Sequence, residues 1–401
     1  MNPKNKKLLA LTSAALALPS MTPTSLQAQT APEEIGVSYR YSKYSESDQS
    51  AQSNTTGQSV ERFDIDIHQF ALVAPLALAP RFSVGVDAGR ETLSGASPWF
   101  VEEGDDGEPI QVLSGASIEE ARNDISLSTN YYGDRFRVGG GIAHSNENDY
   151  ESISQSLTAS VFFNNKNTTL DLGISRSDDD IEPTQDPGID PGRILSDEKN
   201  SESLSIGFTQ VVNKTLLVGG NYSISQYRGF LSDPYKLTSV AGDILRDSRP
   251  NTRDQVSAEF RVRKFLPNVD AAIHADYRFY NNDWGVDSHT LTLAWYQNIG
   301  SWQLSARLRG YDQSAANFFQ NFFTEERSDG FHTSDYRLSN YGAISTKLSA
   351  RKNFENATFE NTSLVFTFED YQSGDGLTSN DDVSPGLVDF QLFSVGIDYS
   401  F

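Results

Sequence analysis

The sequence contains no cysteine, only five histidines and, after residue 28, no apolar run long enough for a membrane helix. The absence of cysteine excludes disulfides, cysteine-ligated metals and cysteine-linked lipid. Because a membrane helix needs about 20 apolar residues, any membrane passage has to be made by strands. Basic residues are also scarce, and the formal net charge is −22. The chain therefore lacks the basic face that displaces counterions from phosphates, and no nucleic-acid partner is expected.

The start of the chain has the pattern of a secretory signal peptide. Three lysines precede an apolar run from Leu8 to Leu18, and small and polar residues follow as far as Ala28. This run is shorter than the roughly 20 residues of a membrane anchor. We therefore expect residues 1–28 to be removed during export and residues 29–401 to form one domain.

The end of the chain has the clearest strand pattern. Residues 393–401 alternate between large apolar side chains and small or polar ones, a period of two that is typical of a strand with one apolar face. Ser394, Gly396, Tyr399 and Phe401 follow the order polar, glycine, aromatic, aromatic. This spacing resembles the C-terminal signal that the barrel-assembly machinery recognises in outer-membrane proteins. A soluble sandwich could end on a similar strand, but the signal peptide favours the outer-membrane barrel.

Similar alternation recurs along the mature chain and predicts sixteen strands, an even number as in bacterial single-chain barrels. A barrel also explains a hydrophobic content of only 37% and a mean hydropathy of −0.47, because only alternate strand residues face lipid. The apolar residues of one face span the segments 35–41, 63–67, 82–86, 125–131, 136–142, 153–163, 170–174, 204–208, 216–224, 256–262, 269–277, 291–295, 302–308, 338–348, 364–368 and 393–401.

The connections between these segments alternate between short and long, as periplasmic turns and external loops do in such barrels. We therefore predict an all-β, antiparallel, up-and-down barrel of about sixteen strands in the cell outer membrane. Its lipid partners would be outer-membrane lipid and lipopolysaccharide. Two external connections, at 146–149 and 281–285, are short, so a miscount of two strands stays open.

Several longer segments carry a family resemblance. They are SGASPW at 94–99, SGASIEEAR at 114–122, GFLSDPYKL at 229–237, SRPNTR at 248–253, YRFYNNDWGVDSHT at 277–290 and RGYDQSAANFF at 309–319. Together they resemble the Gram-negative outer-membrane family catalogued as domain of unknown function 3570. The resemblance covers essentially the whole mature chain. It implies an outer-membrane barrel and no particular activity.

If the apolar residues face lipid, the residues between them line the lumen, and their charges predict two walls. A basic wall on one side and an acidic wall on the other would orient dipolar solutes in a narrow passage. We therefore expect porin-like passive diffusion of small hydrophilic solutes. The basic wall comprises Arg261, Arg263, Arg278, Arg307, Arg309, Lys347 and Arg351, and the acidic wall comprises Asp64, Asp66, Asp87 and Asp124.

An alternative is a plugged structural or interaction barrel without transport. Acidic and basic residues on neighbouring strands, such as Glu259 and Arg261, could form cross-strand pairs in a lumen packed shut. The loop 312–335 is rich in phenylalanine. We expect this loop to fold inward, because an exposed apolar patch promotes aggregation.

A membrane lipid hydrolase is the third alternative. Asp287, Ser288 and His289 contain the residue types of a hydrolytic triad. Neighbours in a strand point to opposite faces, however, so Ser288 and His289 cannot pair directly. The acidic runs at 105–108 and 178–180 offer oxygen ligands, but neither matches a defined calcium loop. No catalytic residue, metal or cofactor is therefore expected.

Overall fold

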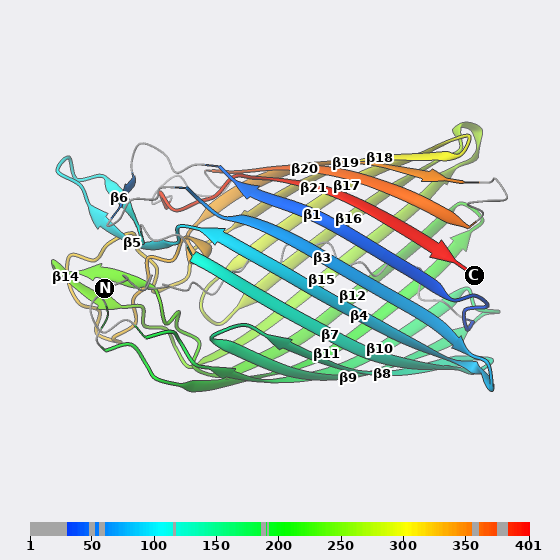
Figure 1. Cartoon of the computed structure of the whole chain (residues 1–401), viewed down its shortest axis with the longest axis horizontal. Helices are drawn as coiled ribbons and strands as arrows, with labels where there is room; N and C mark the ends of the chain where they lie inside the picture. Colours follow the sequence, from blue (N-terminus) through cyan, green and yellow to red (C-terminus); the bar gives the residue numbers. More distant parts are fainter. Residues whose placement is uncertain are drawn as a thin grey trace, which may run out of the picture.

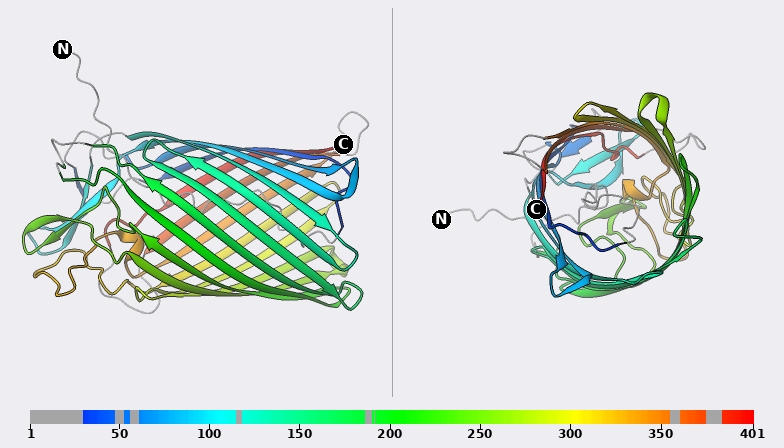
Figure 2. Two further views of the ribbon diagram at one scale, coloured as in Figure 1. Left: turned by 90° about the horizontal axis from the view of Figure 1, so that it is seen from below. Right: turned by 90° about the vertical axis from the view of Figure 1, so that its right-hand side faces the viewer.

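The computed structural model describes residues 30–47, 53–55, 61–114, 118–185, 190, 192–354, 361–374 and 384–401. The expected signal peptide, residues 1–28, lies outside the described residues. The described chain forms a single closed barrel of sixteen antiparallel strands, in agreement with the sequence prediction (Figures 1 and 2). The barrel strands are β1 (Gly36–Glu46), β3 (Asp64–Leu76), β4 (Ala79–Gly95), β7 (Ile118–Tyr132), β8 (Phe136–Asn146), β9 (Tyr150–Phe163), β10 (Thr168–Ile181), β11 (Asp197–Asn213), β12 (Leu216–Gly229), β15 (Thr252–Leu266), β16 (Ala271–Asn282), β17 (Asp287–Ile299), β18 (Trp302–Gln313), β19 (Tyr341–Asn353), β20 (Thr362–Gly374) and β21 (Phe390–Ser400).

The ring closes where the first strand pairs with the last. β1 and β21 run antiparallel in continuous register, from Gly36 opposite Ser400 to Glu46 opposite Phe390. Just beyond the register, the amide of Ile35 donates to the carbonyl of the C-terminal residue at 2.9 Å. The seam thus pairs backbone groups that an open sheet edge would leave exposed to hydrocarbon.

One end of the barrel carries tight turns and the other carries long loops; we call them the turn end and the loop end (Figure 1). The connections at 146–149 and 281–285 are tight turns at the loop end that join barrel strands directly. The predicted number of sixteen strands is therefore confirmed. Among the described residues, no helix is long and apolar enough to cross a membrane. Val269 and Leu338, expected in strands, lie instead in short 3-10 turns. The elements outside the barrel are β2 (Ser53–Thr55), β5 (Pro98–Glu103), β6 (Pro109–Leu113), β13 (Leu237–Val240), β14 (Asp243–Arg246), η2 (Pro267–Val269) and η3 (Tyr336–Leu338).

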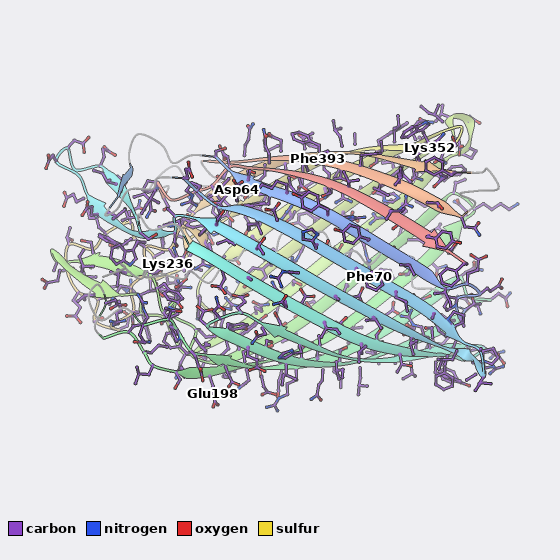
Figure 3. All side chains as sticks on the ribbon, in the orientation of Figure 1. Asp64, Phe70, Glu198, Lys236, Lys352 and Phe393 are labelled. Atoms are coloured by element: carbon purple, nitrogen blue, oxygen red, sulfur yellow. The ribbon has the colours of Figure 1, made fainter. Side chains whose placement is uncertain are left out.

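The outer face carries a belt of exposed apolar side chains, as the alternation predicts. Figure 3 labels Phe70 and Phe393, which are 39% and 48% exposed in the absence of lipid. Neighbouring strands keep the same faces in register, so Leu172 of β10, Ile206 of β11 and Tyr222 of β12 lie side by side. Large apolar side chains that stay exposed on every strand form the surface that a bilayer covers.

The start of β3 contradicts the predicted faces. Register places Tyr39, on the outer face of β1, opposite Phe70, so even-numbered residues of β3 point outward. Asp64 and Asp66 therefore lie on the outer face, and the expectation that they line the pore is wrong. Ile65 and Ile67 point inward, where they are buried.

The reversal has a physical cause in what surrounds the loop end of β3. Inside the barrel, Ile65 joins an apolar cluster with Tyr44, Leu93 and Tyr235, so inward positions there are apolar. Outside, Asp66 accepts a hydrogen bond from Tyr41 at 2.6 Å and lies 3.5 Å from the Lys43 amine. Polar side chains suit this outer position above the apolar belt. The pattern of alternation thus persists, but its faces exchange their polarity along the strand.

The face assignment leads to a prediction on β11. Ile206→Arg places a charge in the apolar belt, whereas Ser205→Arg places the same charge in the lumen. We expect the first change to lower the free energy of unfolding by about 2–4 kcal/mol and the second to have a much smaller effect. Denaturant unfolding of both variants in phospholipid vesicles checks this. Equal destabilisation would show that the faces are wrongly assigned.

Candidate functional site

The predicted basic wall lines the lumen. On β15 and β16, Arg261 lies opposite Asp276, and Arg278 lies opposite Glu259, all on the face that alternates with exposed Phe260 and Tyr277. The predicted arginines of β18, Arg307 and Arg309, alternate in the same way with exposed Leu308. Arg263 lies on the same face of β15 as Arg261, so the five predicted arginines of β15, β16 and β18 all point inward.

Part of this wall is neutralised by carboxylates. The ion pairs join Arg263 to Asp276 at 2.6 Å, Lys347 to Glu369 at 3.0 Å and Arg351 to Asp398 at 2.7 Å, while Arg261 lies 4.0 Å from Glu259. Within the described residues, Arg278, Arg307 and Arg309 have no carboxylate within 4.0 Å. The wall therefore keeps an excess of positive charge.

The opposite side is acidic in fewer positions than predicted. Asp87 points inward from β4 and accepts a hydrogen bond from Ser126 at 3.2 Å. Asp124 of β7 shares its face. In the ring order, β4 lies half-way round from β16. With Asp64 and Asp66 on the outer face, the two-wall arrangement rests on Asp87 and Asp124 against the arginines.

The rest of the lumen is lined by small polar side chains. Serine hydroxyls on neighbouring strands bond to each other, as between Ser177 and Ser201 at 2.9 Å and between Ser203 and Ser225 at 2.8 Å. Such short side chains leave the wall polar without filling the interior. The inward serines of this wall are Ser126, Ser128, Ser152, Ser154, Ser156, Ser175, Ser177, Ser201, Ser203, Ser205, Ser223 and Ser225.

Loops at the loop end pack together into a structure that we call the cap, residues 96–114, 230–251 and 314–340. The phenylalanine-rich loop contributes Phe318 and Phe319, which are buried with Trp284 in one apolar cluster. These side chains are therefore buried within the cap, in agreement with the expectation that they do not form an exposed apolar patch; whether the loop closes the pore stays a prediction. The loops belong to strands spread around the ring, so their contacts carry the cap across the mouth (Figure 2).

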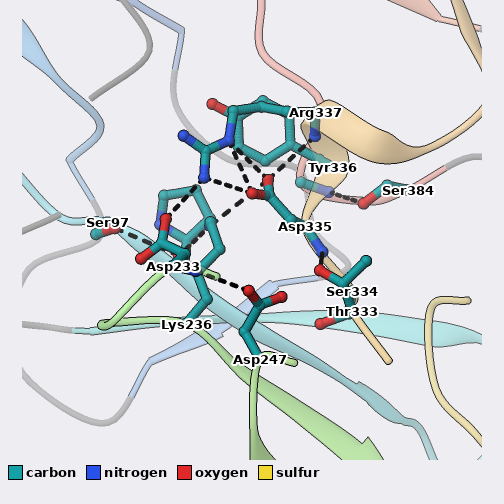
Figure 4. A network of polar contacts seen from close by, with 12 residues as sticks. Ser97, Asp233, Lys236, Asp247, Thr333, Ser334, Asp335, Tyr336, Arg337 and Ser384 are labelled. Carbon is teal, nitrogen blue, oxygen red and sulfur yellow. Dashed lines mark hydrogen bonds and ion pairs between the residues drawn. The ribbon is translucent and has the colours of Figure 1, made fainter. Parts of the chain in front are cut away.

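The centre of the cap is a buried cluster of charges around Asp335, which is 1% exposed (Figure 4). Its carboxylate accepts a hydrogen bond from Arg249 at 2.8 Å, contacts Arg337 and lies 4.0 Å from the Lys236 amine. Arg337 also reaches Asp233 at 2.7 Å. Burial alone would raise the pKa of the Asp335 carboxyl, but the three cations outweigh it and hold that pKa below its usual range.

The cap is also attached to the barrel rim. Tyr235 donates a hydrogen bond to Asp149, in the turn between β8 and β9. Its ring joins the inward apolar cluster of β1 and β3 and lies 4.7 Å from the Arg193 guanidinium. Burial raises the pKa of neighbouring Glu147 to about 7, with repulsion from Asp149 adding to it and Arg122 opposing it. The rim thus holds a carboxyl that titrates near neutrality.

Sequence reasoning missed this cluster of charges. The strand pattern carries no information on how loops meet, and Asp335 lies far along the chain from Asp233, Lys236 and Arg249. A usable signal was present, since the segments GFLSDPYKL and SRPNTR supply Asp233, Lys236 and Arg249.

The positions considered for chemistry do not converge on a reactive site. Ser288 is buried on the inner face, whereas His289 lies on the outer face and pairs with Tyr277 at 2.7 Å. Asp178 and Asp179 point to opposite faces of β10. Among the residues that the structure describes, no group of three or more candidate ligands is arranged to hold a metal ion.

The predicted assembly signal adopts the expected alternation at the end of β21. Tyr399 and Phe401 are exposed on the outer face, and their rings stack at 5.5 Å. Ser394 is buried on the inner face, where its hydroxyl bonds to Ser42 at 2.7 Å. Gly396 lies beside Arg40. Recognition of these residues by the assembly machinery stays a prediction.

Comparisons with known proteins identify a family and a fold. A family profile described as "Protein of unknown function (DUF3570)" matches residues 8–393. No curated protein matches the sequence.

Solved structures share the architecture at low sequence identity. A bacterial polysaccharide outer membrane secretin has a TM-score of 0.51 at 7% identity, over 92% of this chain and 98% of its own. CdiB from Acinetobacter baumannii has a TM-score of 0.50 at 9% identity, over 92% of this chain and 60% of its own. OpdQ of Pseudomonas aeruginosa has a TM-score of 0.43 at 9% identity, over 92% of this chain and 98% of its own. The fold is that of an outer-membrane barrel.

The first prediction for the site concerns Asp335. Asp335→Asn leaves the buried cations of the cap without their shared carboxylate, which we expect to destabilise the cap by about 3 kcal/mol. Limited proteolysis of the folded barrel should then cut within residues 314–340. Asp329→Asn, which removes an exposed pair with Arg327 in the same loop, should change little. Cap loops equally resistant in both variants would contradict the central role of Asp335.

The second prediction concerns pH. In the folded chain the pKa of Glu147 is about 7, whereas its usual value is 4.5. The free energy of unfolding should therefore fall as the pH rises from 4.5 to about 7. Glu147→Gln should remove this loss. The free energy of unfolding of the variant, relative to that of the wild type, should therefore be about 2 kcal/mol higher at pH 8 than at pH 5. Thermal denaturation in detergent at both pH values measures it. A variant with the wild-type pH dependence would refute the assignment.

Proposed function

The chain belongs to the DUF3570 family, and we propose that its barrel is a pore for the passive diffusion of small hydrophilic solutes across the outer membrane. The observation that carries the proposal is the composition of the inner face. Serines are frequent on one side, and arginines gather on the other, of which Arg278, Arg307 and Arg309 lack carboxylate partners within the described chain. A barrel of this strand number encloses an aqueous interior unless loops fill it.

The charges support a solute passage with a transverse field. Arg278 on β16 faces the side of Asp87 on β4, so positive and negative groups lie on opposite walls. In a narrow passage of low dielectric, such a field orients dipoles and concentrates ions. The excess of arginine favours anions.

A second candidate is a plugged barrel that interacts with partners and transports nothing. The cap favours it, because loops from several sides of the ring meet over the mouth around the buried Asp335. Buried ion pairs of this kind resist opening, since separating them leaves a charge unpaired. Both candidates are non-enzymatic and fit the chain's fold.

Single-channel recording of the purified full-length protein in a planar bilayer separates the two. We expect steady currents on the nanosiemens scale from a water-filled barrel of this size. Asp335→Asn, by loosening the cap, should raise the conductance or the open fraction. Silence from both proteins would favour the plugged barrel.

Ion selectivity tests the arginines directly. Arg278→Ala combined with Arg307→Ala removes two positive charges from the lumen, so the reversal potential in a salt gradient should shift toward cation selectivity. Arg81→Ala, at the turn end where the side chain is 57% exposed and pairs with Asp134, is the control and should not shift it. Unchanged selectivity in the double variant would defeat the two-wall proposal.

A further inference from the structure

Arg278, Arg307 and Arg309 of the lumen wall differ from their neighbours in having no ion pair with any residue that the structure describes. Arg263, Lys347 and Arg351 each contact a carboxylate within 3.0 Å. Arg278 lies directly across from Glu259, but within the described residues Glu259 makes its one ion pair with Arg261. A guanidinium without an ion pair has donors available for a ligand.

The strand between these arginines carries small side chains. On β17, Thr290 lies between Arg278 and Tyr311, and Thr292 lies between Asp276 and Arg309. Ala294, one step further, lies beside Arg307. Arg278 is thus level with Tyr311 of β18, two strands or about 10 Å away. Arg309 lies two residues and Arg307 four residues from Tyr311 along β18, and the side chains between the strands are short. We call the arginines of β16 and β18 together with Thr290, Thr292 and Ala294 the arginine patch.

Aromatic residues border the patch at both ends along the strands. Tyr280 lies on the loop side, where its hydroxyl is held by Gln255 at 2.8 Å. Tyr296 lies on the turn side, with its ring 4.4 Å from that of His274. The arginine patch is therefore limited along the strands by these aromatic residues. Its extent suits one small molecule and not a polymer.

We propose that the arginine patch is a binding site for small organic anions, which it holds through their carboxylate or phosphate oxygens. The forked donors of arginine match both groups in bidentate geometry. Arg278 lies on one side of β17 and Arg309 on the other, one inward position apart along the strands, so that an anion lying over Thr290 and Thr292 meets donors from two strands. Arg307 lies one further inward position along β18. The inference rests on the proposed function in that the solute reaches the patch through the lumen.

The two ends of the lumen differ in how a solute would reach the patch. The cap lies over the loop end, whereas the turns at the other end connect adjacent strands directly. In detergent solution the turn end, which the cap does not cover, faces the solvent. Binding can therefore be measured without requiring passage.

Isothermal titration calorimetry of the detergent-solubilised full chain tests the proposal. The probes are benzoate for a carboxylate, inorganic phosphate for a phosphate, and benzyl alcohol as a neutral molecule of similar shape. We expect benzoate or phosphate to bind the wild-type protein, with affinity falling as salt increases, and benzyl alcohol not to bind. The anion that binds identifies the chemical class.

The matched variants locate the site. Replacing Arg278, Arg307 and Arg309 together by glutamine should weaken anion binding by about tenfold or more. Arg307→Gln alone should weaken it less and keeps the test available if the triple variant does not fold. Arg137→Gln removes the same charge from β8, half-way round the ring from β18, and should leave the affinity unchanged.

Three results would overturn the proposal: no anion binding to the wild-type protein, unchanged affinity in the triple variant, or equal losses in the triple variant and Arg137→Gln. The failures of the two proposals are distinguishable. A protein that binds benzoate yet carries no current keeps the site and loses the pore. A protein that conducts but binds neither anion keeps the pore and loses the site.

Discussion

The structure depends on one constraint: each backbone amide and carbonyl that meets hydrocarbon must bond within the protein. The seam between β1 and β21 satisfies it, because the register from Gly36 to Glu46 leaves no free edge. Closure then imposes the division of every strand into an outer and an inner face. The apolar belt, the serine wall and the basic wall all follow from that division, since alternate residues meet lipid and water.

Charge placement follows a second rule, which depends on burial. The chain carries a net charge of −22, yet arginines without an ion pair to any described residue gather on β16 and β18 of the lumen. In the cap, by contrast, Asp335 is compensated by three basic residues in a dry environment. In the lumen some charged groups are paired and others are not, whereas the buried carboxylate of the cap is compensated by neighbouring cations. This contrast separates the wall that can act on solutes from the cap that holds loops together.

Alternation predicted every barrel strand because the period of two is a local property of the chain. It failed at Asp64 and Asp66 because polarity alone does not say which face is inside, and near the cap the inner face is the apolar one. The arginines of β15, β16 and β18 were placed correctly, since each alternates with large apolar residues. The pairing of these arginines and the cluster around Asp335 depend on long-range contacts. The alternation of residues along a strand carries no information about such contacts.

The cap joins parts of the chain that are far apart in the sequence. The Lys236 amine donates to the carbonyl of Pro98 at 2.9 Å across 138 positions, and Asp335 completes the cluster from a loop that follows β18. Closing such long segments is entropically unfavourable until the strands beneath have been brought together. We therefore expect the cap to form late in folding, after the strands of the barrel have paired. The lumen would therefore become ordered before the cap.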